Sequence, residues 1–253
     1  MTNGHRAEYE FYYWPHLPGR GELIRLVFEA AGADYVDVCR LPAEQGGGVE
    51  RLLEILQHET DPASADGQLR PFAPPIVRHE GALYSQTANL LDYTGRRLGL
   101  AGDSEFEARC ALQLQLCISD TLSEIHDVHH PISASLYYED QKGQAVAKAG
   151  HFLKTRLWKW LTYYRGVLTA NGGEFLIGRR LTYVDLSLFQ LLTGLEYAFP
   201  KSYERVRVDY PELARQRTRI AECDQLAEYL ASDRRIPFNE HGIFRYYSEL
   251  DLS

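Results

Sequence analysis

Strand-like and helix-like spacings of hydrophobic residues alternate at the start of the chain. Residues 9–14 form a short aromatic run that is typical of a strand and ends at Pro15. Residues 20–31 place apolar side chains at helical spacing, and Gly32 supplies a stop signal. Residues 35–38 form another strand-like run. This segment therefore predicts a strand, a crossover helix and a second strand parallel to the first.

The next part of the chain predicts a second helix, a hairpin and a third helix. Residues 49–57 have the apolar spacing of a short helix, and residues 76–79 have the composition of a strand. Glu80-Gly81 is a hairpin turn signal before a return strand at 82–84. Residues 86–98 predict a helix. The predicted order of elements is β-α-β-α-β-β-α.

Strand signals end after Gly102, and helical patterns fill the rest of the chain. One helix is expected around residues 110–119, and others are expected at 144–169, at 183–198 and within 209–232. Residues 99–103 have the composition of a linker. We therefore predict a thioredoxin-like α/β domain at residues 1–98, followed by an all-helical bundle domain at residues 104–253.

Composition and charge narrow the class of protein. The chain has 253 residues, 45% of them hydrophobic and 25% charged, which are globular proportions. Its net charge of −8 argues against a nucleic-acid binder, which needs a basic face. No stretch has the length of a membrane span, and the first residues lack an apolar signal core. A soluble, intracellular protein that binds neither nucleic acid nor membrane is expected.

Four local patterns carry a resemblance to a known family. Tyr12-Tyr13-Trp14-Pro15 is followed by Gly19-Arg20-Gly21-Glu22-Leu23-Ile24-Arg25 at the start of the first predicted helix, and Pro75 precedes Gln86-Thr87 by eleven residues. Residues 175–178 lead into Leu181-Thr182-Tyr183-Val184-Asp185, and the two predicted domains follow each other in a fixed order. Together these patterns resemble the cytosolic glutathione transferases over nearly the whole chain.

The resemblance implies a thiol-activating role for Tyr13. Transfer of glutathione needs its thiol as the thiolate, whereas a free thiol is mostly protonated at neutral pH. A phenolic O–H at the end of a strand favours the sulfur anion by donating a hydrogen bond to it, and the start of the following helix favours negative charge as well. Tyr12 is the rival, but strand alternation sends the two side chains to opposite faces, so only one can reach the sulfur.

Seven further residues are implied as glutathione contacts. Gln86 and Thr87 match the pair that holds the γ-glutamyl end, and Arg20 is a candidate to neutralise its carboxylate. Pro75, expected in cis, matches the proline whose preceding carbonyl meets the cysteinyl amide. The other three expected contacts are Pro74, Ile76 and, for the glycyl carboxylate, Arg70. Pro74 has no N–H, so one anchoring bond that the family offers is missing.

Other side chains keep more than one interpretation. The segment from Asp120 to His130 is rich in acidic and histidine residues, and His126 and His130 have a spacing that suits zinc on a helix. It permits a metal site, a polar substrate pocket or subunit interface, or a helix end before Pro131. Thr182 and Asp185 form a capping-box pattern, which is structural. No cysteine lies in the loop after the first strand, which argues against dithiol chemistry.

We therefore predict a glutathione transferase without metal that conjugates the thiolate to small, mostly apolar electrophiles. The resemblance implies a cytoplasmic homodimer with a role in detoxification. Two alternatives stay open on the same fold: a non-catalytic glutathione-binding module, and a glutathione-dependent isomerase or reductase.

Overall fold

Four short strands form one mixed sheet in the N-terminal part of the molecule. The computed structural model describes residues 7–57 and 68–251. The sheet order is β2-β1-β3-β4; β1 is parallel to β2 and antiparallel to β3, which is antiparallel to β4. The strands are β1 Tyr9–Tyr12, β2 Tyr35–Asp37, β3 Ile76–His79 and β4 Ala82–Ser85. The hairpin between β3 and β4 turns at Glu80 and Gly81, both with positive φ as a tight primed turn requires.

The two faces of the sheet bury different side chains because residues alternate along each strand. Phe11 and Tyr13 belong to the large core beneath α1 and α3, whereas Tyr12 packs with Ile76 and Leu52 on the face that α2 covers. These helices are α1 Gly21–Ala31, α2 Val49–Leu56 and α3 Thr87–Arg97, and two 3₁₀ turns, Val38–Arg40 and Ala43–Gln45, precede α2. The predicted thioredoxin-like order is confirmed.

The rest of the chain is helical, as predicted. Its α-helices are α4 Glu105–His129, α5 Lys142–His151, α6 Leu157–Ala170, α7 Tyr183–Ala198, α8 Pro200–Asp209, α9 Pro211–Ala221 and α10 Asp224–Leu230. A 3₁₀ turn, Tyr138–Gln141, precedes α5, and a π-helical segment, Phe152–Arg156, joins α5 to α6.

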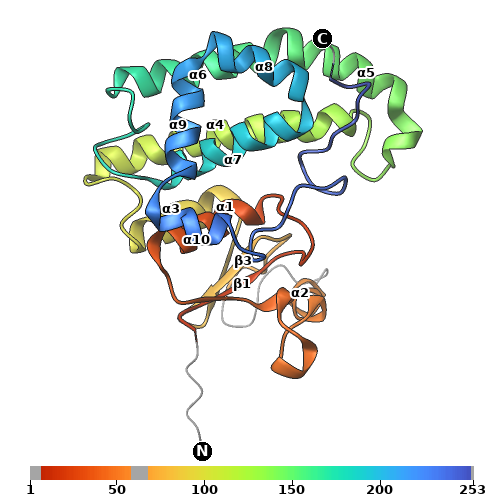
Figure 1. Cartoon of the computed structure of the whole chain (residues 1–253). Coiled ribbons are helices and arrows are strands. Elements are labelled where there is room, and N and C mark those ends of the chain that lie inside the picture. The colour runs from red at the N-terminus through yellow and green to blue at the C-terminus, as the bar shows by residue number, and fades with distance from the viewer. Residues whose placement is uncertain (1–6, 58–67, 252–253) are drawn as a thin grey trace, which may run out of the picture.

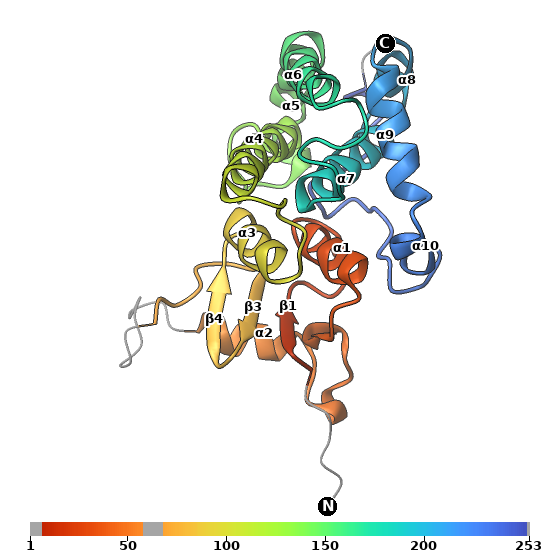
Figure 2. The ribbon, with the colours of Figure 1, turned by 90° about the vertical axis from the view of Figure 1, so that its left-hand side faces the viewer.

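Helices α1 and α3 lie between the sheet and the helical domain (Figures 1 and 2), where α3 packs on α4 and α1 packs on α7 and α10. Helix α7 is buried along nearly its whole length and contacts α4, α8 and α9 as well. A helix that is apolar on all sides belongs at the centre of a core, and α7 occupies the range 183–198 that its sequence predicted.

Three helical predictions need correction. The expected single helix at 144–169 is divided into α5 and α6 by the π-helical segment. The single helix expected within 209–232 is two helices, since α9 ends at Ala221 and α10 begins at Asp224. Helix α8 was not predicted. Pro200 and Pro211 occupy first-turn positions, where the missing N–H removes no hydrogen bond, so α8 and α9 each begin at a proline.

Candidate functional site

A cleft of about 660 Å³ lies where β3 and α3 begin and α4 passes over them. Five of the eight predicted site residues line it: Arg20, Pro74, Pro75, Gln86 and Thr87. The Pro74–Pro75 peptide bond is cis, as predicted. Segments from four separate parts of the sequence therefore meet at one concave surface. The family resemblance, and not the hydrophobic pattern, had implied that Arg20, Pro74-Pro75 and Gln86-Thr87 lie together.

Tyr13 lies directly behind Arg20 at the start of α1. It follows the last residue of β1, and only 7% of its surface is exposed. The backbone N–H of Arg20 donates a hydrogen bond to the Tyr13 hydroxyl, with an N···O distance of 3.0 Å. Tyr12 lies on the opposite face and donates to Glu10 at 2.7 Å. The predicted divergence of the two tyrosines is thus confirmed, and Tyr13 is the one beside the cleft.

Two glycines make room for the Tyr13 ring. A Cβ atom at Gly19 would lie 2.3 Å from the phenolic oxygen, and one at Gly21 would lie 2.5 Å from the ring carbons. Such distances are far below van der Waals contact, so either substitution would push the ring out of place. Gly19 also has a φ of 43°, which side chains rarely adopt. The Gly-Arg-Gly sequence therefore holds the phenol against the helix terminus.

The electrostatics around Tyr13 keep it a proton donor. Burial raises the pKa of Tyr13, while the Arg20 N–H and the charges of Arg20 and Arg25 act in the opposite direction. The phenol is therefore protonated at neutral pH. Its oxygen accepts the Arg20 N–H, and no residue in the described part of the chain accepts the phenolic proton through a hydrogen bond. A hydroxyl that accepts one hydrogen bond becomes a better donor for another.

A buried ion-pair network fixes the loop between Tyr13 and α1. Arg25 is fully buried; its Nε donates to Asp37 at 2.8 Å, and its Nη1 lies 3.4 Å from Glu22. Nη1 also donates to the carbonyl of Leu17 in the loop. On the other side, Glu22 accepts from Tyr229 at 2.5 Å. Charges buried in this way are stable only while all partners are present, so the network holds the loop in one conformation.

Gln86 and Thr87 present polar groups at the start of α3. Thr87 is buried, whereas Gln86 is exposed and serves as the residue before the helix. The backbone of Gln86 has a φ of 71°, an unusual conformation for a residue other than glycine. Strain of this kind persists where the surroundings hold it and is frequent at ligand sites. Arg20 spans the cleft from the other side, with Nη2 3.3 Å from the Ser123 hydroxyl of α4.

Three predicted residues lie outside this cleft lining: Tyr13, which is behind Arg20, and Ile76 and Arg70. The Ile76 side chain is fully buried on the α2 face of the sheet, so only its backbone is near the cleft. Arg70 is half-buried in the segment before β3 and does not line the cleft. His16, a possible helper in the loop, is exposed, and its carbonyl accepts from Asn239 at 2.9 Å. Sequence reasoning missed Ser119 and Ser123, although their spacing of four residues on α4 marks one helix face.

His126 and His129 at the end of α4 and His130 after it form a cluster of neighbouring rings, with one stacked pair and two T-shaped pairs. The His126 and His130 rings are 4.9 Å apart, and His129 is 5.2 Å from His126. His129 Nε2 lies 2.8 Å from the carbonyl oxygen of Ile243, which fixes the ring. Within residues 7–57 and 68–251, no group of three or more His, Cys, Asp or Glu side chains is arranged to hold a metal ion.

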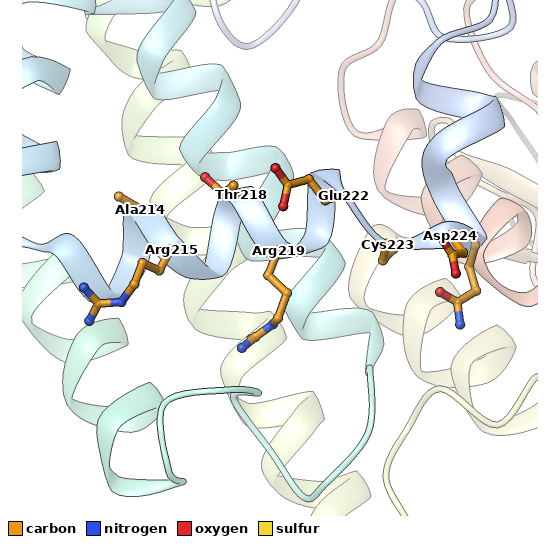
Figure 3. A pocket seen from close by; sticks show the side chains of 8 residues that line it. Ala214, Arg215, Thr218, Arg219, Glu222, Cys223 and Asp224 are labelled. Carbon is orange, nitrogen blue, oxygen red and sulfur yellow. The ribbon is translucent and has the colours of Figure 1, made fainter.

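A second hollow, of about 670 Å³, lies on α9 and α10, away from the predicted residues (Figure 3). Arg215 and Arg219 project from α9 around it, Glu222 directly follows α9, and Cys223 lies at the junction with α10. Burial raises the pKa of the Cys223 thiol, which makes it a poor nucleophile at neutral pH. This hollow shares no residue with the cleft.

Comparisons with known proteins agree with this geometry. Residues 126–233 match the family described as "Glutathione S-transferase, C-terminal domain". The chain is 26% identical to rat glutathione S-transferase alpha-1 over 89% of this chain and 90% of the relative. It is 21% identical to a glutathione S-transferase of Plasmodium yoelii yoelii over 85% and 89% of the two chains. The chain is therefore similar to glutathione S-transferases along most of its length.

Solved structures of glutathione S-transferases share the fold. The sigma-class protein of Fasciola hepatica has a TM-score of 0.66 at 21% identity, covering 92% of this chain and 99% of that one. Na-GST-3 of Necator americanus, described as monomeric, has a TM-score of 0.65 at 17% identity, covering 92% and 100%. These likenesses span more than one class and therefore assign no class to this chain. In the part of the chain that the structure describes, no helix combines the length and apolarity needed to cross a membrane.

Proposed function

We propose that this protein is a glutathione transferase that joins the glutathione sulfur to small electrophiles. The observation that carries the proposal is the Tyr13 hydroxyl, which accepts the Arg20 N–H and has its own proton free for an anion beside the cleft. Glutathione would lie between Pro74-Pro75, Gln86-Thr87 and Arg20. The protein supplies orientation and stabilisation of the thiolate, and glutathione supplies the reacting atom.

Conjugation to 1-chloro-2,4-dinitrobenzene tests this activity directly. The expected result is saturable, enzyme-dependent formation of the thioether with release of chloride. Binding of glutathione without turnover on a broad panel of electrophiles would favour a non-catalytic module instead. Regeneration of glutathione during turnover would favour an isomerase or reductase. Cytoplasmic location and a role in detoxification remain part of the proposal and rest on the family resemblance.

Gln86 provides a prediction that separates binding from stability. Replacing Gln86 by glycine removes the amide while relieving the backbone at a φ of 71°. We expect glutathione affinity to fall about ten-fold, the effect of losing one good hydrogen bond. The free energy of unfolding should rise by about 1 kcal/mol, the lower end of the range for backbone strain. Calorimetric titration with glutathione and thermal unfolding measure the two effects.

Glu80→Gly is the matched control for this prediction. Glu80 is the other described residue that has a positive φ without being glycine, 51°, and it lies in the β3–β4 turn, outside the cleft lining. It should gain comparable stability without any change in glutathione affinity. An unchanged affinity in Gln86→Gly would remove Gln86 from the proposed binding site.

We further propose that the protein is a homodimer. Phe72, in the segment before β3, is 92% exposed, and Leu116 on α4 is 52% exposed. A groove of about 480 Å³ lies between α4 and α6. Its lining includes Phe106, Cys110 and Tyr163. Phe72 and Leu116 lie at the cleft described above, and Phe106 in the groove is 77% exposed. Large exposed apolar side chains of this kind are typical of an interface. A second copy of this chain, contributing its Phe72, is the occupant that we propose.

The oligomeric state should therefore depend on Phe72. We expect Phe72→Asp to raise the dimer dissociation constant by about a hundred-fold, as loss of a buried aromatic anchor does. Analytical ultracentrifugation over a concentration series measures it. Val208→Asp is the control, because Val208 is also exposed, at 77%, but lies on α8. A wild-type protein that stays monomeric at high concentration would contradict the proposed dimer.

A further inference from the structure

The C-terminal segment after α10 crosses back over the region between the two domains. Figure 1 shows residues 231–251 running from α10 to the far side of the helical domain. The segment is fixed at several points: Asn239 donates to the His16 carbonyl at 2.9 Å, and His129 meets the Ile243 carbonyl at 2.8 Å. At its end, Asp251 accepts from the backbone N–H groups of α8. This segment therefore forms an ordered wall rather than a loose terminus.

A pocket of about 430 Å³ lies where this segment passes the end of α4. We call it the tail pocket; His130, Ser135, Tyr138, Arg245 and Tyr247 are among its lining residues. Its walls are held in place: Tyr138 and Tyr247 stack with centroids 3.8 Å apart, and His130 Nδ1 lies 3.2 Å from the buried Gln141 amide. The pocket is thus preformed and mainly polar, so it suits a polar group of a ligand better than an apolar one.

Two routes lead from the loop beside Tyr13 towards the tail pocket. On the helix side, Arg20 contacts Ser123 on α4, the charges of both Arg20 and Arg245 act on His126 of that helix, and His130 directly follows its last residue. Seven helical residues rise by about 10 Å, so Ser123 and the pocket end of α4 are separated by about the length of a substituted aromatic molecule with a short arm. On the tail side, Asn239 bridges the His16 carbonyl and the backbone N–H of His241. A molecule reacting beside Tyr13 could therefore extend an arm into this pocket.

Arg245 gives the pocket its charge. Its Nε and Nη2 donate to the carbonyls of Gly242 and His241, which fixes the guanidinium without neutralising it. Among the residues that the structure describes, no carboxylate lies within 4 Å of Arg245 to form an ion pair. Glu139 and Glu240 also line the pocket, but both are exposed, so solvent screens them more than the half-buried Arg245.

The neighbouring histidines are consistent with an uncompensated positive charge. Burial is the main cause that lowers the pKa values of His126, His129 and His130, and the Arg245 charge lowers all three further. For His129 the pKa falls to about 3. The imidazoles are therefore neutral at pH 7, and Arg245 is the cation that an anionic ligand would meet.

We propose that the tail pocket binds the carboxylate arm of the electrophile, with Arg245 as the residue that selects for it. This inference rests on the proposed transferase function and narrows its substrate class. The reacting end of the acceptor would be apolar and lie beside Tyr13, and the anionic arm would reach Arg245. In such a reaction the thiol adds across an activated double bond: the sulfur–carbon bond forms, the π bond breaks, and the thiol proton ends on the neighbouring carbon through solvent.

Ethacrynic acid and its methyl ester test this selection, because they share one reactive vinyl ketone and differ in the charge of the arm. The measured quantity is the ratio of kcat/KM for the acid to kcat/KM for the ester. We expect Arg245→Gln to lower this ratio ten-fold to a hundred-fold, the value of a charge-assisted hydrogen bond, through KM for the acid. Arg207→Gln, an exposed arginine on α8, should leave the ratio unchanged. A ratio that does not fall in Arg245→Gln would overturn the proposal.

A binding measurement keeps this proposal separate from the transferase activity. The saturated analogue of ethacrynic acid has the same arm and cannot react, so calorimetry measures its affinity without turnover. Weaker binding by Arg245→Gln than by wild type and Arg207→Gln supports the carboxylate site. If binding weakens in this way but neither the acid nor the ester is conjugated, the transferase proposal fails and the carboxylate site stands. Equal binding by all three proteins overturns the carboxylate site, whatever the activity.

Discussion

Replacing Tyr13 by phenylalanine is expected to lower kcat/KM for glutathione conjugation by about 10²-fold. Loss of one preorganised donor to an anion typically has an effect of this size. The ring and its packing stay, because phenylalanine fills the same space beside Gly19 and Gly21, so the change removes only the hydroxyl. The donor that the Arg20 N–H aligns would then be absent, and the thiol of bound glutathione would ionise less readily.

The thiol pKa distinguishes this role from a structural one. Ultraviolet titration of enzyme-bound glutathione should give a thiol pKa about 1–2 units higher in Tyr13→Phe than in wild type, within the effect expected of a lost charge-assisted hydrogen bond. Tyr12→Phe is the matched control, since Tyr12 lies on the α2 face and donates to Glu10. A Tyr13→Phe variant with the activity and the thiol pKa of wild type would contradict the thiolate-stabilising role of Tyr13.

The fold could be predicted from the sequence because the local signals agree with the packing of the whole molecule. Alternation along β1 alone separated Tyr12 from Tyr13, and the structure places them in different hydrophobic clusters. The turn signal at Glu80-Gly81 and the stop at Gly32 both coincide with positive φ values. These features depend on neighbours in the sequence, which is why a single sequence contains them.

The parts that escaped prediction depend on contacts between distant residues. The Arg20 N–H meets the Tyr13 hydroxyl only because two glycines allow a close approach, and no periodicity encodes that distance. The side chain of Ile76 follows the strand alternation onto the α2 face, although the family resemblance counts it among the binding residues. The path of residues 231–251 has no period at all, because it is fixed by individual hydrogen bonds to His16 and His129.

Asp185 should be one of the most sensitive positions for stability. Its carboxylate is fully buried and accepts from the backbone N–H groups of Leu176 and Thr182, at 2.8 and 2.9 Å. It also accepts from the Thr182 hydroxyl at 2.6 Å, so the predicted capping box forms at the start of the central helix α7. Asp185→Ala would leave buried donors without an acceptor, at a cost of about 3–5 kcal/mol.

Urea unfolding of wild type, Asp185→Ala and the milder Asp185→Asn measures this loss. Asp209→Ala, on the exposed surface, should stay within about 0.5 kcal/mol of wild type.

The loss of stability in Asp185→Ala should also depend on pH. Burial raises the pKa of Asp185 to about 6, so the folded protein holds a proton that the unfolded chain has released between about pH 4 and pH 6. Stability from Asp185 is therefore greatest at low pH and decreases as the pH rises through this window. The difference between wild type and Asp185→Ala should grow by about 1 kcal/mol from pH 7 to pH 5. A difference that shrinks on acidification would mean that the three donors outweigh burial and hold the carboxyl ionised.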